Sequence, residues 1–138
     1  MKKTLDKIDT FLQEHHVLSL ATMANEDISV CNLFYTFDKT SVSFIVASDS
    51  KTVHIQHIQQ NTNIAGSVVL ETKTVGKIQG IQFQGNMELL KDKTLSKLYF
   101  KNFPYAKALL PTLYKITIQK FKMTDNTLGF GKKLLWNI

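Results

Sequence analysis

Hydrophobic residues near the start of the chain fall at helical spacing, and those that follow alternate with polar residues. Leu5, Ile8 and Leu12 recur as on one face of a helix, so residues 4–16 predict an amphipathic helix. Runs rich in β-branched and aromatic residues predict three strands after it, at residues 17–23, 28–37 and 41–47. Their connections are short enough for hairpins, so we expect antiparallel neighbours.

The segment FIVASDSKTVHIQHI, residues 44–58, changes from an apolar run to a polar stretch and then to a spaced pattern. It predicts a buried strand, a turn and a helix. Asp49 or Ser50 is expected to cap this helix, which leaves the next backbone N–H groups without intrahelical partners. With Lys51, the hydroxyl of Thr52 and the helix dipole, these groups suit a phosphate. The same pattern is also ordinary capping chemistry.

Alternation returns in the middle of the chain. Residues 63–70 read as a strand with Gly66 inside it, which marks a bulge or a close backbone approach. Residues 76–90 alternate clearly between apolar and polar positions. Gly80 and Gly85 within them permit the bends that a small barrel needs.

The last third combines helices with two more strands. Asp92 predicts the N-cap of a helix at 93–103, and Pro104 begins a further short helix. Residues 112–124 alternate as a strand, and residues 128–136 predict a glycine-punctuated terminal strand. Six or seven strands with three or four helices fit best a small closed β-barrel with helices outside it. An open sheet covered by helices on one face is the alternative.

Length and composition fit one globular domain. The chain has 138 residues, of which 43% are hydrophobic and 20% charged, without a linker rich in Pro, Gly or Ser. No apolar stretch is long enough to cross a bilayer, and Asp6, Asp9 and Glu14 interrupt what would be the core of a secretory signal. A single cysteine, Cys31, agrees with a cytoplasmic protein, which is what we expect.

The net charge of +6 comes entirely from lysine, since the 17 basic residues include no arginine. Residues 91–138 contain ten lysines against Asp92 and Asp125. Arginine is the favoured residue for bidentate contacts to guanine, so its absence argues against a nucleic-acid partner. We interpret the lysines as a solvated surface.

No self-sufficient enzyme motif is present. There is no P-loop, no G-x-G-x-x-G and no nucleophile elbow. His54 and His57 are spaced to share a helix face, but two histidines make an incomplete metal site, so a structural role is favoured over metal or haem ligation. Cys31, inside an apolar strand, is expected to be buried rather than reactive.

The order of these segments resembles a known superfamily. A helix followed by LATM, CNLFYTF and ASDSKTVHI is similar to the FMN-binding split barrels of the pyridoxamine 5'-phosphate oxidase-like type. The stretches GIQFQG and TDNTLGFGKKLLW are most similar to a small group of uncharacterised bacterial YhbP-like proteins. The likeness covers nearly the whole chain. It implies a mainly β fold: a six- to seven-stranded antiparallel split β-barrel with outer helices, forming one FMN-binding domain over residues 1–138.

The resemblance also implies a homodimer with ligand sites at the subunit interface. The FMN phosphate would be held by four residues: Ser48, Ser50, Lys51 and Thr52. One strand would lie along the flavin ring, partly through its backbone: Asn32, Leu33, Phe34 and Tyr35.

Gln82 or Gln84 would reach the ribityl chain or the ring, and Trp136 would close the site from the partner subunit. Structural roles are the alternative. Phe34 and Tyr35 then belong to the core or the dimer interface, the glutamines to a solvated face, and Trp136 to packing in the dimer.

Two differences from the superfamily's pattern limit which of its properties we expect in this chain. The superfamily often places an arginine where Cys31 or Asn32 stands, and lysine cannot reproduce its forked geometry. The arginine and histidine pattern that holds pyridoxal phosphate is missing, so pyridoxamine-phosphate oxidase activity is not expected. The function predicted is an FMN-binding flavoprotein, an oxidoreductase or flavin reductase taking electrons from a nicotinamide donor. The alternative is a non-catalytic flavin- or haem-binding module.

Overall fold

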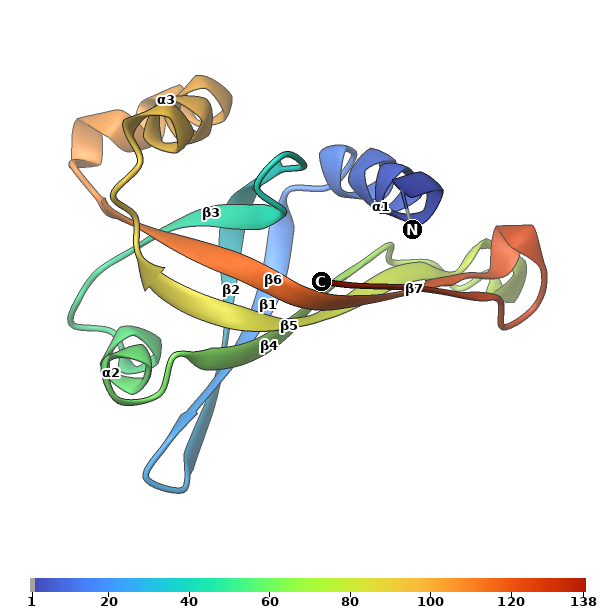
Figure 1. The fold of residues 1–138 in the computed structure, drawn as a ribbon, viewed down its shortest axis with the longest axis horizontal. Coiled ribbons are helices and arrows are strands. Elements are labelled where there is room, and N and C mark those ends of the chain that lie inside the picture. Colours follow the sequence, from blue (N-terminus) through green and yellow to red (C-terminus); the bar gives the residue numbers. More distant parts are fainter. Residues whose placement is uncertain (1) are drawn as a thin grey trace.

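The structure is a computed structural model that describes residues 2–138. Seven strands and three α-helices, with three short 3-10 turns between them, make up the fold (Figure 1). In chain order they are α1 (Lys2–Gln13), β1 (Val17–Ala24), β2 (Asp27–Asp38), β3 (Ser43–Ser48), α2 (Val53–Gln60), β4 (Asn63–Val69), β5 (Gln79–Leu89), α3 (Lys93–Asn102), β6 (Thr112–Asp125) and β7 (Lys133–Asn137). None of the helices over residues 2–138 is long and apolar enough to cross a membrane.

All strand pairs are antiparallel, and six of the strands close into a barrel. The sheet order is β3-β2-β1-β4-β5-β6-β7, and an additional pairing of β3 with β6 closes it. The long strand β6 shares one edge between two partners: residues 112–117 pair with β3, and residues 120–124 pair with β7. The predicted mainly β barrel with outer helices is therefore confirmed, and the open sheet is wrong.

The apolar run at residues 44–47 is explained by burial on both faces of β3. Phe44 and Val46 point into the barrel and belong to its main core. Ile45, between them, points outwards and packs with Leu95 and Tyr99 of α3 in a second, smaller core. A strand covered on both faces reads as continuous apolar sequence rather than as alternation.

The main core is rich in aromatic side chains. Phe44 lies at its centre, with ring centroids 4.8 Å from Phe83 and 5.1 Å from Phe37. The buried face of α1 joins this core through Ile8 and Leu12. The predicted amphipathic helix at the start of the chain is thus confirmed, although it ends at Gln13 rather than at residue 16, and it covers the barrel.

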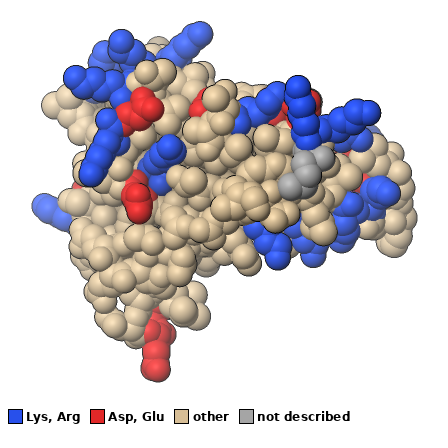
Figure 2. Space-filling view, in the orientation of Figure 1, with Lys and Arg blue, Asp and Glu red and all other residues tan. Residues whose placement is uncertain are grey.

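The hairpin of β1 and β2 extends beyond the rest of the barrel (Figure 1). Its two-residue turn is formed by Asn25 and Glu26, which both have positive φ angles, 50° and 65°. Turns of this type match the twist of the flanking strands. Acidic side chains lie at this tip, while lysines dominate over α3 and along the arm formed by β7 and the parts of β5 and β6 beside it (Figure 2).

The end of the chain differs from the prediction. The terminal strand begins only at Lys133, not at residue 128. Gly129 and Gly131 have φ angles of 137° and 72°, a backbone conformation that turns the chain before β7. The short helix predicted after Pro104 is present, but as a 3-10 helix.

Gly66 has no room for a side chain, which confirms the close approach predicted for it. A Cβ atom there would overlap the ring of Phe83 and the carbonyl oxygen of Ser19. Gly66→Ala should therefore lower the free energy of unfolding by about 1–3 kcal/mol in urea titrations. Gly76→Ala, where no atom lies within 4 Å of the added carbon, is the matched control. An equal effect of both substitutions would contradict the packing argument.

Candidate functional site

The connection between β3 and α2 is where the sequence predicts a phosphate site. The helix begins at Val53, so its N-cap is Thr52 rather than Asp49 or Ser50, and Thr52 makes no side-chain capping bond. The Asp49 carboxylate instead accepts the N–H of Lys51 at 2.9 Å. The first turn of α2 is therefore left without a side-chain cap.

The hydroxyl groups of this connection are largely engaged within the chain. Ser48 Oγ lies 2.5 Å from His54 Nε2, and Thr52 Oγ1 donates to the carbonyl of Asp49 at 2.8 Å. Burial, with a smaller contribution from the nearby His57, lowers the pKa of His54 from its usual 6.5, so its imidazole is neutral at pH 7. Asp49, Ser50 and Lys51 remain exposed, so a carboxylate faces solvent beside the hydroxyl and the ammonium group.

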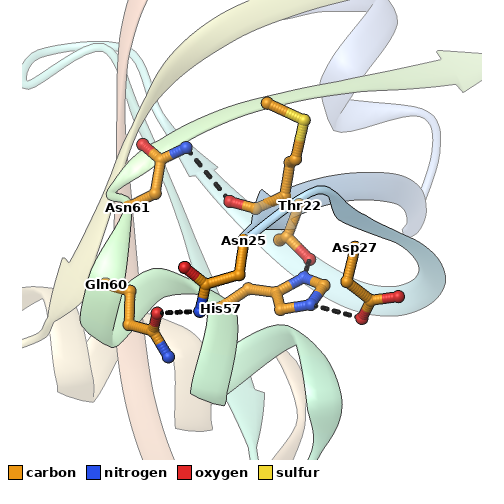
Figure 3. A network of polar contacts seen from close by, with 7 residues as sticks. Thr22, Asn25, Asp27, His57, Gln60 and Asn61 are labelled. Carbon is orange, nitrogen blue, oxygen red and sulfur yellow. Dashed lines mark hydrogen bonds and ion pairs between the residues drawn. The ribbon is translucent and has the colours of Figure 1, made fainter.

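A second histidine of α2 joins the helix to the β1–β2 hairpin (Figure 3). His57 is buried, with Nδ1 2.8 Å from Thr22 Oγ1 and Nε2 2.8 Å from Asp27 Oδ2. On either side of it, Asn25 Nδ2 donates to Gln60 Oε1, and Asn61 Nδ2 donates to the carbonyl of Met23. Four hydrogen bonds, made by the side chains of His57, Gln60 and Asn61, thus hold the C-terminal half of α2 and its C-cap against the hairpin.

This network determines what the two histidines can do. Both ring nitrogens of His57 already have partners, and His54 Nε2 is bonded to Ser48. Within residues 2–138, no group of three or more potential metal ligands comes together. The structural role predicted for the pair agrees with these contacts, which position α2 and therefore the segment before it.

The strand expected along a flavin ring presents its side chains alternately. Asn32 and Phe34 lie on the outer face of β2, where Ser19 Oγ donates to Asn32 Oδ1 at 2.8 Å. Leu33 packs against the main core, and Tyr35 is buried with its hydroxyl donating to the carbonyl of Leu12. Only two of the four side chains are therefore available to a ligand on the outer face.

Gln82 and Gln84 line a hollow of about 490 Å³ on the outer face of the sheet. Its opposite side is formed by Lys120 and Lys122, which pair in register with Gln84 and Gln82 respectively. The lysines were not singled out from the sequence, although their alternation in QKFKM places both on one face of β6. Two amide and two ammonium groups make this hollow suited to an anionic or strongly polar ligand.

The remaining two candidates, Trp136 and Cys31, contact the main core. Trp136 belongs to the main core, 9% exposed, with its ring centroid 5.9 Å from that of Phe121. Cys31 is half-buried, and burial raises the pKa of its thiol, which disfavours a reactive thiolate. Within one chain, the predicted site residues thus occupy separate places: the β3–α2 connection, the outer face of β2, the glutamine hollow and the core.

Comparison with known proteins identifies close relatives by sequence. The chain is 36% identical to the UPF0306 protein YhbP of Escherichia fergusonii over 137 residues, covering 97% of this chain and 93% of the relative. It is also 36% identical to a UPF0306 protein of Cronobacter sakazakii over 135 residues, covering 96% and 94% of the two chains. No family model matches the chain. The predicted resemblance to the YhbP-like group is confirmed.

Solved structures share the fold at much lower identity. A haem-binding protein from Mycobacterium smegmatis has a TM-score of 0.81 at 12% identity, covering 97% of this chain and 57% of that one. An FAD-binding protein from Mesorhizobium loti has a TM-score of 0.72 at 14% identity, covering 85% and 89%. A protein from Listeria innocua, assigned without proof as a pyridoxamine 5'-phosphate oxidase, has a TM-score of 0.70 at 14% identity, covering 86% and 96%. The split-barrel fold is confirmed.

His57→Ala should lower the free energy of unfolding by about 1–3 kcal/mol, because it removes two hydrogen bonds and leaves the buried Thr22 hydroxyl unpaired. Urea titration at pH 7 measures the change. Gln59→Ala, an exposed position on the same helix, is the control for altered helix propensity. A loss no larger than that of the control would show that the network does not stabilise the fold.

Proposed function

We propose that this chain, which belongs to the UPF0306 family, is an FMN-binding flavoprotein of the pyridoxamine-phosphate-oxidase-like type. The observation that carries the proposal is the uncapped first turn of α2 beside the exposed Ser50 and Lys51. It occurs on a fold that the chain shares with an FAD-binding protein. Uncapped N–H groups, the helix dipole and a lysine charge together favour a phosphate.

The residues present fit a phosphate in part. Lys51 supplies a full positive charge, and Ser50 supplies an exposed hydroxyl that can donate a hydrogen bond. Asp49 disfavours a phosphate at this position, because its carboxylate carries a negative charge. The carboxylate also already accepts the backbone N–H of Lys51, at 2.9 Å. With no arginine in the chain, a single lysine carries the ion pair. We therefore expect FMN to bind reversibly, at micromolar concentrations.

The rest of the ligand would contact the outer face of the sheet. Asn32 and Phe34 lie there on β2, and Gln82 and Gln84 line the hollow on β5. Since one chain keeps these residues apart from the β3–α2 connection, we propose that a second copy completes each site. A homodimer of this kind places ligands between the subunits.

An apolar strip on the hairpin supplies the surface for that second copy. On β2, Ile28 and Val30 are 70% and 68% exposed, and the outer face of β1 places Met23 and Ala21 directly opposite them. Adjacent exposed apolar residues on two strands are typical of an interaction surface in a soluble protein. We propose that this strip, defined by these four residues, packs against its symmetry mate.

FMN supplies the electron-transfer chemistry in such a protein, and the chain binds and orients it. We propose an oxidoreductase or flavin reductase that takes electrons from a nicotinamide donor in the cytoplasm. Lys51 would hold the phosphate, and Asn32 and Phe34 would limit where the ring lies. Pyridoxamine-phosphate oxidase activity is not part of the proposal, because the residues that hold pyridoxal phosphate are missing.

A non-catalytic binding module is the second candidate, with a flavin or haem as its ligand. It draws support from the haem-binding protein of M. smegmatis, which has the same fold. Haem ligation by His54 or His57 would require breaking the hydrogen bonds that hold α2, so these histidines do not favour it. Purified protein that binds FMN without reduction by NADH or NADPH would favour the module.

Lys51→Ala should weaken FMN binding about ten- to hundredfold, because it removes a charge-assisted contact to the phosphate. Asp49→Asn should strengthen it, because an opposing charge is lost while the side chain can still accept the Lys51 N–H. Fluorescence titration measures both, with riboflavin as a ligand that lacks the phosphate and Lys73→Ala as an exposed lysine control. Equal effects on FMN and riboflavin would contradict the phosphate assignment.

Val30→Lys should convert the dimer into folded monomers, because it places a charge in the centre of the apolar strip. Light scattering after gel filtration gives the mass, and circular dichroism confirms folding. Val75→Lys is the control, since Val75 is 53% exposed in the 3-10 turn before β5. A wild-type chain that is monomeric at micromolar concentration would overturn the proposed assembly.

A further inference from the structure

A cavity of about 400 Å³ opens between the end of α1, the strand β2 and the end of α3. We call it the α1–α3 cavity; the residues that matter for its chemistry are His15, His16, Phe34, Asn102 and Phe103. Its volume is within the range of small-molecule sites, which are concave and lined by aromatic groups with a few polar ones. The predicted phosphate residues Ser50 and Lys51 do not line it.

One wall of the cavity is aromatic. The rings of Phe34 and Phe103 lie 5.5 Å apart between centroids, tilted by 49°. Phe103 is held from behind by Tyr99, at 5.0 Å, while Phe34 is 59% exposed. A large exposed phenyl ring beside a fixed one offers a surface on which another planar ring can stack.

Most polar groups of the cavity are bonded within the chain. Tyr35 donates to the carbonyl of Leu12 at 2.7 Å, and Asn102 Nδ2 donates to Thr36 Oγ1 at 3.0 Å. The imidazoles of His15 and His16 differ, because neither ring makes a hydrogen bond to any residue in the part of the chain described, 2–138. His15 only stacks on Phe11, with centroids 4.3 Å apart.

The imidazoles of His15 and His16 indicate which kind of ligand the cavity can bind. Each imidazole carries at least one N–H donor at any pH, so the pair can bind a group with two acceptor oxygens. No aspartate or glutamate lines the cavity, so a negative charge there meets no opposing carboxylate. An aromatic wall beside two imidazole donors fits a planar ring that carries a carboxylate.

We propose that the α1–α3 cavity binds aromatic carboxylates of one or two rings, with the ring on Phe34 and Phe103 and the carboxylate at His15 and His16. This site is separate from the β3–α2 connection. It shares Phe34 with the surface proposed for the flavin ring. Its test is made without flavin, so the outcome does not depend on whether the chain binds FMN.

Three probes applied to the full chain without flavin test the proposal by isothermal titration calorimetry. Benzoate carries both features, benzyl alcohol keeps the ring without the charge, and acetate keeps the charge without the ring. We expect benzoate to bind at least about tenfold more tightly than either of the others, because each lacks one of the two contacts. Equal binding of benzyl alcohol, or no binding of benzoate at millimolar concentration, would overturn the proposal.

Variants show whether binding occurs in this cavity. His16→Ala and Phe34→Ala change exposed side chains, so both should fold, and each should weaken benzoate binding about tenfold. Phe130→Ala, a phenyl ring 86% exposed in the turn before β7, should leave it unchanged. Unaltered affinity in both cavity variants would place benzoate elsewhere and refute the assignment. A Soret band with added haemin that is lost in His16→Ala would identify haem as the ligand and refute it equally.

Discussion

The pairing of β3 with the first half of β6 is the constraint on which the other features of this fold depend. Without it the strands would form an open sheet, and Phe44 and Val46 would lack the opposite wall against which they pack. It also positions Ile45 outwards, where α3 covers it. Because β3 ends at Ser48, the same pairing determines where the chain leaves the barrel towards α2.

The position of α2 follows from a second, local constraint. The helix has only eight residues, too few to be stable alone, and its buried face includes two histidines. Their hydrogen bonds to Ser48, Thr22 and Asp27 connect it at one end to β3 and at the other to the hairpin. Packing and hydrogen bonding therefore fix the helix, while its first turn keeps free N–H groups. The absence of a side-chain cap is the feature that leaves this turn open to a ligand.

Alternation and turn residues in the sequence were enough to predict the barrel, because each strand shows either period two or the continuous apolar run of a strand covered on both faces. The N-cap of α2 could not be predicted in the same way. Ser-Asp-Ser-Lys-Thr offers four residues that can cap a helix, and the burial of His54 and Ile55 decides that the helix begins at Val53. The start of β7 likewise depends on Gly129 and Gly131. Their positive φ angles continue the turn through these residues, so the strand begins only at Lys133.

The site was harder to predict than the fold, since adjacent residues of a strand point to opposite faces. Phe34 and Tyr35 are both aromatic, and only the register with β1 shows which of them faces outwards. Trp136 and Leu134 share the inner face of β7, with the exposed Leu135 between them, so Trp136 packs against the core of its own chain rather than projecting from the surface. Contacts between strands, rather than the local sequence pattern, therefore determine which side chains face a ligand and which belong to the core.

The outer face of the sheet explains why one chain can hold separate parts of one site. A single row of paired residues crosses five strands: Asn32, Ser19, Ser67, Gln82 and Lys122. The next row changes from Val30 and Ala21 to Gln84 and Lys120, so the face is apolar at the hairpin and cationic at β6. A twofold axis through the apolar end would pack the apolar residues of one subunit against the same residues of the other. It would leave each cationic hollow at the rim of the interface. In the proposed dimer, polarity along the rows would therefore separate the surface that joins the subunits from the surface that meets the ligand.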